Sequence, residues 1–167
     1  MKNALQFDFI TDKEKNTITI RREFAAKRQL VWDCHTKREL LDKWFAPKPF
    51  TTKTKSMEFR EGGHWLYAMV DPDGKEYWGR TEYLKIYPID GYQTNDVFAD
   101  ENGNANPDLP VAKWDVSFSD KGNNTLVQTI VSYPSLEALE TVINMGMKEG
   151  LISTLERLDD LLLTLNK

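Results

Sequence analysis

The chain has 167 residues, of which 40% are hydrophobic and 29% charged, as in a single globular domain. Its net charge of −4 argues against a nucleic-acid-binding surface, which needs clustered basic residues. The single cysteine excludes an internal disulfide and fits a reducing compartment, and no stretch reaches the ~20 apolar residues of a membrane span. We therefore expect one domain over residues 1–167, without a signal peptide, in the cytoplasm.

Two strands are predicted at the start of the chain. Leu5, Phe7 and Phe9 alternate with polar residues, and Ile18 and Ile20 share one face of the segment NTITIRREF. The polar segment TDKEKN between them has the composition of a turn.

Two short helices are predicted next, in residues 25–36 and 36–45, because apolar residues recur there at helical spacing. Thr36 and Glu39 have the spacing of a capping box for the second helix. Pro47 and Pro49 are expected to end it.

Residues 51–133 change to a period of two and predict about six further strands joined by short turns, which favours an antiparallel meander. The segment FREGGHWLYAM places Gly62 and Gly63 directly before an aromatic strand. Glycine permits the backbone conformations of a sharp corner, so we expect the chain to bend there. Trp65, Tyr67 and Met69 would then lie on one face.

The C-terminal segment predicts a long amphipathic helix that packs on the sheet, with Ser135 as its N-cap. Gly146 and Gly150 interrupt its apolar stripe, and each costs about 1 kcal/mol relative to alanine inside a helix. Two interpretations remain open: the glycines break the helix, or they leave room for the sheet or for a ligand.

This order of elements resembles the helix-grip fold of the START-like (SRPBCC) superfamily, and more narrowly bacterial proteins similar to the C-terminal domain of Aha-type activators of the heat-shock chaperone ATPase. The matching stretches are REFAAKRQLVWDCHTKRELLDKWFAPKPF, MEFREGGHWLYAMVDPDGKEYWGRTEYLKIYP and MGMKEGLISTLERLDDLL. The resemblance implies an α+β fold, in which a curved antiparallel sheet of about six or seven strands wraps a long C-terminal helix, with two short helices after the first strand.

A helix gripped by a curved sheet is expected to leave an apolar cavity, because ligand pockets are mostly apolar and tryptophan and tyrosine give them rigid walls. The residues expected to line this cavity and bind a ligand are Trp44, Phe45, Trp65, Tyr67, Met69, Trp78, Phe98, Trp114, Val116, Met147 and Gly150. The alternative is that these side chains simply fill a core. Residues 100–110 form either a lid over the cavity or a solvated loop.

The sequence predicts no catalytic residue, cofactor or metal site. Cys34 and His35 are adjacent on a helix and point about 100° apart, so they do not form a nucleophile–base pair. His64 is expected to face away from Trp65, and no metal-binding or nucleotide-binding motif occurs. Three carboxylates are placed near the cavity mouth without a defined acid–base role: Glu82, Asp96 and Glu101.

Three functions fit these observations. The first is binding of a small hydrophobic or amphipathic molecule in the cavity. The second is a protein-interaction module whose partner is a chaperone ATPase, as the resemblance implies. The third is a cyclase-like or aromatase-like enzyme, with Tyr67, Tyr83 and Glu82 as candidate proton donors, and we expect binding rather than catalysis.

Overall fold

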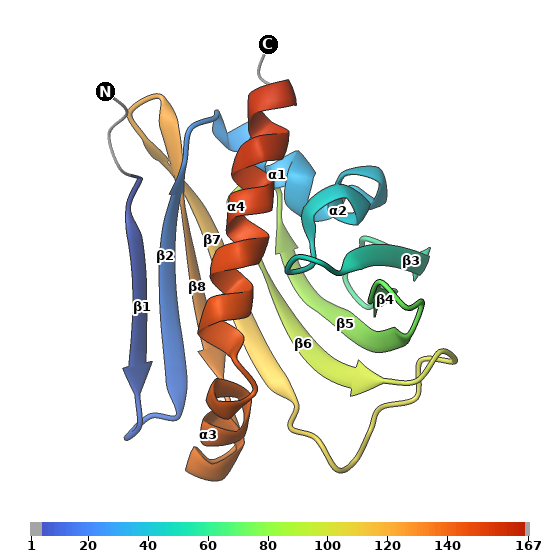
Figure 1. Ribbon diagram of the computed structural model, residues 1–167. Helices are drawn as coiled ribbons and strands as arrows, with labels where there is room; N and C mark the ends of the chain where they lie inside the picture. The colour runs from blue at the N-terminus through green and yellow to red at the C-terminus, as the bar shows by residue number, and fades with distance from the viewer. Residues whose placement is uncertain (1–4, 166–167) are drawn as a thin grey trace.

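The computed structural model describes residues 5–165 as one curved sheet with helices on its concave side (Figure 1). Eight antiparallel strands lie in the order β1-β2-β8-β7-β6-β5-β4-β3. Their bounds are β1 Phe7–Asp12, β2 Thr17–Phe24, β3 Thr51–Met57, β4 His64–Val70, β5 Glu76–Tyr87, β6 Gly91–Ala99, β7 Ala112–Lys121 and β8 Asn124–Ser132. Sequential neighbours pair from β3 to β8, which confirms the predicted meander.

The predicted α+β helix-grip fold is confirmed, with two differences of detail. The sheet has eight strands rather than six or seven, and the short helices α1 (Arg28–Thr36) and α2 (Arg38–Trp44) follow the second strand rather than the first. The reason is that β1 and β2 form a hairpin of their own, in which Asp12 pairs with Thr17, before β2 joins β8.

The register of the strands separates the two faces of the sheet, because directly opposed residues in an antiparallel pair share a face. Trp65 on β4 opposes Thr81 on β5, which opposes Asp96 on β6. We call the face that carries these residues, which α4 (Met147–Leu165) crosses in Figure 1, the concave face.

The glycine pair forms the predicted corner between β3 and β4. Gly62 has φ +83°, and a Cβ at Gly63 would lie 2.1 Å from the Glu58 carbonyl oxygen, closer than any side chain tolerates. The corner is bound to β5, because the Gly62 N–H donates to the Tyr83 carbonyl and the Tyr83 N–H donates to that of Gly63, at 2.8 and 3.0 Å.

The C-terminal segment forms two helices, α3 and α4. Of the two interpretations of the glycines, the broken helix is therefore the correct one. Ser135 caps α3 (Leu136–Asn144) as predicted, since its hydroxyl accepts the Ala138 N–H at 3.1 Å. Gly146 has φ +84° and separates α3 from α4. Gly150 lies inside α4, so only the first glycine breaks the helix, and a Cβ added at Gly150 would meet Pro47 carbons at 3.9 Å.

The predicted capping box at the start of α2 is wrong. The N-cap residue is Lys37, which makes no side-chain capping hydrogen bond. The Thr36 hydroxyl instead donates to the Trp32 carbonyl at 2.9 Å, within the preceding helix. Thr36 is the last residue of α1, so its side chain is already engaged when α2 begins.

The helices divide the core between them. Leu155, Leu158 and Leu162 of α4 pack with α1, α2 and the middle of the sheet, whereas Leu139 and Val142 of α3 pack in a second cluster against β2 and β8. These leucines bury the apolar stripe seen in the sequence, which is the main source of stability for amphipathic helices.

Polar contacts fix α4 to both halves of the molecule. Arg157 donates to the carbonyl oxygens of Ala46 and Phe50 at 2.8 and 2.6 Å, which ties the helix to the segment between α2 and β3. On the other side, the guanidinium of Arg22 on β2 forms an ion pair with the carboxylate of Asp159.

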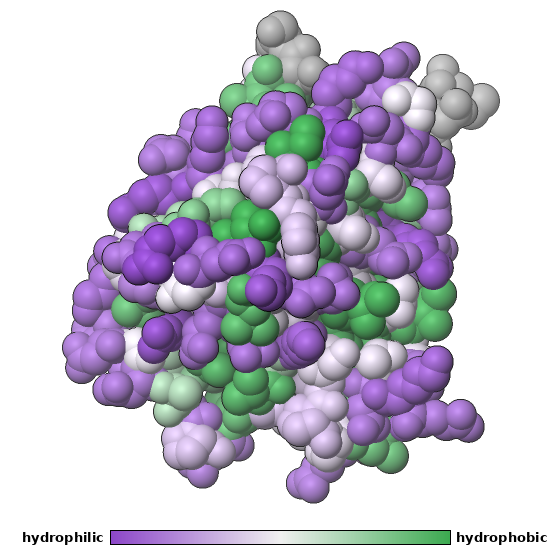
Figure 2. All heavy atoms as spheres, turned by 180° about the vertical axis from the view of Figure 1, so that it is seen from behind, coloured by the Kyte–Doolittle hydropathy of each residue, from purple (hydrophilic) through white to green (hydrophobic). Residues whose placement is uncertain are grey.

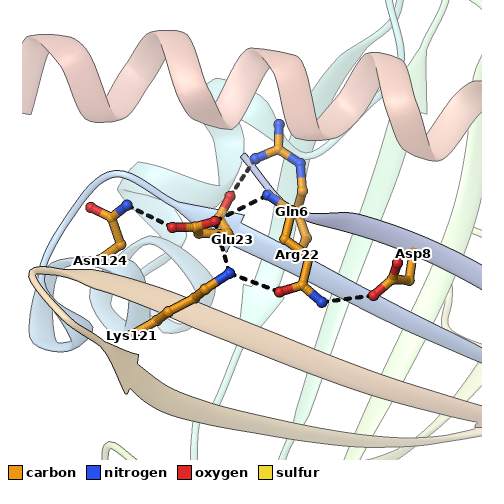
Figure 3. A network of polar contacts seen from close by, with 6 residues as sticks. All are labelled: Gln6, Asp8, Arg22, Glu23, Lys121 and Asn124. Atoms are coloured by element: carbon orange, nitrogen blue, oxygen red, sulfur yellow. Dashed lines mark hydrogen bonds and ion pairs between the residues drawn. The ribbon is translucent and has the colours of Figure 1, made fainter. Parts of the chain in front are cut away.

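A polar network joins the open end of the β1–β2 hairpin, away from its turn, to the β7–β8 turn (Figure 3). The Glu23 carboxylate accepts the Asn124 amide at 2.7 Å, the Gln6 backbone N–H at 3.1 Å and the Lys121 ammonium at 3.1 Å. These hydrogen bonds, the Asn124 amide first, lower the pKa of Glu23 from 4.5 to about 2. Glu23 therefore stays ionised at neutral pH and joins three segments.

The back of the molecule, opposite α4, carries hydrophobic residues in separate patches among hydrophilic ones (Figure 2). None of the described helices is long and apolar enough to cross a membrane. The large apolar hollow of the molecule lies on the other side of the sheet, beneath the helices.

Candidate functional site

A hollow of about 470 Å³ lies between the concave face of the sheet and the helices α2, α3 and α4. It reaches the surface at three lining residues with exposed side chains: Tyr77, Phe98 and Met145 are 46%, 36% and 58% accessible to solvent. A volume of this size accommodates a small organic molecule.

All eleven residues expected at the cavity line this hollow. They come from α2, from the strands β4 to β7 and from α4, so segments distant in the sequence meet there. Whether these side chains bind a ligand remains a prediction.

Trp78 differs from the other ten because the strand register does not direct its side chain to the concave face. Trp78 opposes Ala68 on β4, so the register puts its side chain on the outer face, where the Lys55 ammonium lies 5.7 Å from the ring centroid. Both faces of β5 carry large side chains, so parity alone did not identify the inward one.

The aromatic wall is built around Trp65 and Tyr67. Their rings stack with centroids 4.1 Å apart, and the Phe45 ring meets them edge-on at 4.8 and 5.6 Å. Gly79 opposes Tyr67 on β5, and a Cβ there would lie 2.8 Å from the Tyr67 ring. The absent side chain lets this ring lie flat across the strand.

A chain of polar groups holds the wall in place from behind. The Trp65 indole N–H donates to the Thr54 hydroxyl at 3.0 Å, which donates to the Asp42 carboxylate on α2 at 2.5 Å. The Trp44 indole N–H donates to the Cys34 carbonyl at 2.8 Å. These bonds fix the orientation of two large rings, so the wall is preorganised.

Among the described residues, two charged side chains line the hollow: Arg22 and Asp96. Arg22 is engaged by Asp159. Asp96 accepts the Thr94 hydroxyl at 3.0 Å and the hydroxyl of Thr81 on the neighbouring strand. Burial raises the pKa of Asp96 from 3.8 to about 7, and the two hydroxyls only partly offset this effect.

Four tyrosines from different elements line the hollow and interact electrostatically with this carboxyl group: Tyr67 on β4, Tyr83 on β5, Tyr92 on β6, and Tyr133 after β8. Burial raises the pKa of each hydroxyl well above its ordinary value, and the nearby Asp96 adds to the effect. They remain neutral at physiological pH.

Asp96 is the lining residue whose position the sequence pattern predicts least well. The sequence predicts Asp96, Glu82 and Glu101 near the mouth of the cavity, yet of these three only Asp96 lines the hollow. Glu82 opposes His64 and Asn95 and lies on the outer face, and Glu101 belongs to the loop after β6. The available signal was parity, because Asp96 stands two residues before Phe98 on one strand.

The histidines are structural. The imidazole of His35 lies at the hollow, but its Nδ1 is 2.7 Å from the Val31 carbonyl, and burial lowers its pKa to about 4. The Nε2 of His64 is 2.9 Å from the Ser56 hydroxyl on the outer face, as the predicted orientation requires. Cys34 is fully buried, and burial raises its thiol pKa to about 11, so it is not a reactive thiolate.

The loop of residues 100–110 does not cover the hollow along its length. Ala99 forms a bridge with Ala105, and a Cβ added at Gly103 would lie 3.6 Å from the Leu66 side chain, on the outer face of β4. Only Pro110 at its end lines the hollow. The first half of the loop therefore packs behind the sheet.

In residues 5–165 no group of three or more His, Cys, Asp or Glu side chains is arranged to hold a metal ion. The chemistry offered by the hollow is thus an aromatic enclosure with one unpaired carboxyl group.

Comparison with known proteins places this geometry in a family. Residues 25–163 match the family model described as "Activator of Hsp90 ATPase homolog 1-like protein". No curated protein matches the sequence significantly.

Solved bacterial structures are similar over nearly the whole chain. Protein Ms6760 from Mycobacterium smegmatis is 32% identical, with a TM-score of 0.86 over 95% of this chain and 97% of that one. A protein from Arthrobacter aurescens is 29% identical, with a TM-score of 0.85 over 91% and 88% of the two chains. A protein from Staphylococcus epidermidis is 29% identical, with a TM-score of 0.82 over 92% and 93%. The chain therefore belongs to the family of Activator of Hsp90 ATPase homolog 1-like proteins.

Proposed function

We propose that this protein binds a small apolar or amphipathic molecule in the hollow between the sheet and the helices. The single observation that carries the proposal is a preorganised, mostly apolar hollow of about 470 Å³ that reaches the surface. At ~24 cal/mol per Å³, a closed dry void of this size would cost about 11 kcal/mol. The hollow is open to water, so its actual cost is smaller, but its apolar walls remain unpacked when no ligand is bound. A ligand that fills the space stabilises the fold by mass action.

The proposal is tested by measuring the melting temperature of the protein with fatty acids, sterols and aromatic metabolites. A ligand present at 100 times its Kd should add about 2.7 kcal/mol to the stability, a shift of several degrees. Absence of any rise across the whole set contradicts the proposal.

Two phenylalanine variants show whether a detected ligand occupies the hollow. Gly150→Phe adds a ring where a Cβ meets only Pro47 at 3.9 Å, so the ring has room to enter the space. Glu156→Phe places the same ring on an exposed position of the same helix. Circular dichroism checks that both fold. We expect loss of binding in the first variant and unchanged binding in the second.

The family description favours a second candidate, interaction with a chaperone ATPase. This function would use an outer surface, so Gly150→Phe should leave it intact. Co-purification with the host's chaperone and a change in its ATPase rate are the expected results, and absence of both dismisses this candidate.

A further inference from the structure

We propose that the hollow binds the protonated amine of an amphipathic ligand, with Asp96 as its counter-ion and the aromatic walls around its apolar body. This inference rests on the proposed function and names the chemical class of its ligand. It is carried by the charges and the aromatic faces of the lining.

The lining holds one carboxyl group without a cationic partner. Of its two charged residues among those the structure describes, Arg22 is held by Asp159 on α4. Arg22 lies on β2 and Asp96 on β6, three strand spacings apart, about 14 Å along the sheet. No cation therefore offsets the Asp96 charge from within the hollow.

The hydrogen bonds of Asp96 leave part of its capacity free. An ionised carboxylate has about four acceptor positions. The hydroxyls of Thr94 on β6 and Thr81 on β5 occupy two of these positions. Both threonines lie on the concave face beside the hollow. An ammonium group, with three N–H donors, supplies both the missing charge and the missing donors.

The aromatic lining of the hollow is a second feature that suits a cation. Tyr67, Tyr92 and Trp114 line the same hollow, and the negative faces of aromatic rings attract ammonium groups when water is excluded. A carboxylate ligand would meet like charge at Asp96, and a neutral alcohol would supply one donor without the charge. For ligands that share one apolar body, we therefore expect the lining to prefer an ammonium head group over an alcohol or a carboxylate.

The titration behaviour of the site agrees with this geometry. The titratable groups of β4, β5, β6 and the segment after β8 that interact electrostatically with Asp96 are the hydroxyls of Tyr67, Tyr83, Tyr92 and Tyr133, all neutral. Burial without a counter-ion raises the pKa of Asp96 to about 7. An arriving ammonium lowers it again, so amine binding near neutral pH releases a proton from the protein.

The test compares three probes with the same phenylalkyl body: phenylbutylamine, phenylbutanol and phenylbutyrate. Isothermal titration calorimetry at about pH 8 keeps both the amine and Asp96 charged. We expect the amine to bind at least about tenfold more tightly than the alcohol, and phenylbutyrate more weakly than either.

Asp96→Asn removes the charge and keeps the shape of the side chain. It should reduce the affinity for phenylbutylamine by about tenfold or more, to that of phenylbutanol, and change the affinity for the alcohol by no more than about twofold. Glu82→Gln is the matched control, because it removes one carboxylate from the adjacent strand on the outer face. It should leave all three affinities unchanged.

The outcomes separate this inference from the function on which it rests. Equal or tighter binding of the alcohol or the acid, or an amine preference that survives Asp96→Asn, overturns the amine assignment and leaves cavity binding standing. Amine binding that survives Gly150→Phe overturns it as well, because the amine then binds elsewhere. Absence of binding for all three probes, together with no hit in the melting screen, overturns both proposals.

Discussion

Asp96→Asn is expected to stabilise the free protein at alkaline pH and to flatten the pH dependence of its stability. The folded protein raises the pKa of this carboxyl group from 3.8 to about 7, so the native state binds more protons than the unfolded state between these values. The free energy of unfolding therefore receives the full contribution of Asp96 below pH 3.8. It loses that contribution as the pH rises through about 7.

The size of the effect follows from the same values. One pKa unit corresponds to about 1.4 kcal/mol, so the whole interval amounts to about 4 kcal/mol. Water that enters the open hollow reduces the burial penalty, and we expect about 2 kcal/mol to remain. Asparagine does not ionise, so the variant does not lose this free energy of unfolding at high pH.

Urea denaturation of both proteins at intervals from about pH 4 to about pH 8 measures the difference. His35 contributes the opposite trend, because its lowered pKa makes stability rise with pH over part of this range, but it contributes equally to both proteins. The wild-type deficit relative to Asp96→Asn should grow from near zero to about 2 kcal/mol, while Glu82→Gln shows no such growth. A variant that is less stable than wild type at about pH 8 would show that the carboxylate is stabilised in the fold, and would refute the reasoning.

Three further predictions concern the scaffold. Gly150→Ala should raise the stability by about 0.5–1 kcal/mol, because the added Cβ would make only ordinary contact with Pro47. Gly146→Ala should lower the stability by about 1 kcal/mol, because the φ of this residue is positive. Melting temperatures that move in the same direction in both variants contradict this reasoning. Thr54→Val should cost about 2 kcal/mol in urea denaturation, since it leaves the buried Trp65 indole N–H without its acceptor and the half-buried Asp42 carboxylate without this donor, and a neutral effect would show that they find other partners. Glu23→Gln should lower stability by about 1 kcal/mol at neutral pH, and this cost should vanish as the pH falls through the interval from 4.5 to about 2, where the wild-type carboxylate takes up its proton; a cost that persists in acid argues against the ionised form as the stabilising one.

The strands and the lining of the hollow were accessible from the sequence because both follow simple rules. Period-two alternation identified the strands, and the glycine pair at Gly62 and Gly63 located the corner that turns the aromatic strand inward. The helix break was left open because the apolar stripe continues past Gly146, and only its positive φ decides the matter. The capping box failed because the hydroxyl of Thr36 bonds within its own helix.

Charge at the site was harder to predict than shape. The alternation in β6 gives Asp96 and Phe98 the same side, but an acidic residue facing an apolar space contradicts ordinary preference, so the pattern favoured the mouth of the cavity. Trp78 is the converse case, since it is among the residues that line the hollow although its register puts the ring on the outer face of β5. Residues that violate the usual preference at a site are those that local patterns assign least well.

The break at Gly146 lets the two C-terminal helices take different directions. α3 packs in one apolar cluster through Leu139, whereas α4 contacts both clusters, because Met147 and Leu151 pack against that cluster and Leu158 lies in the other. A continuous helix keeps one direction, so the positive φ of a single glycine allows residues of both helices to line the same hollow.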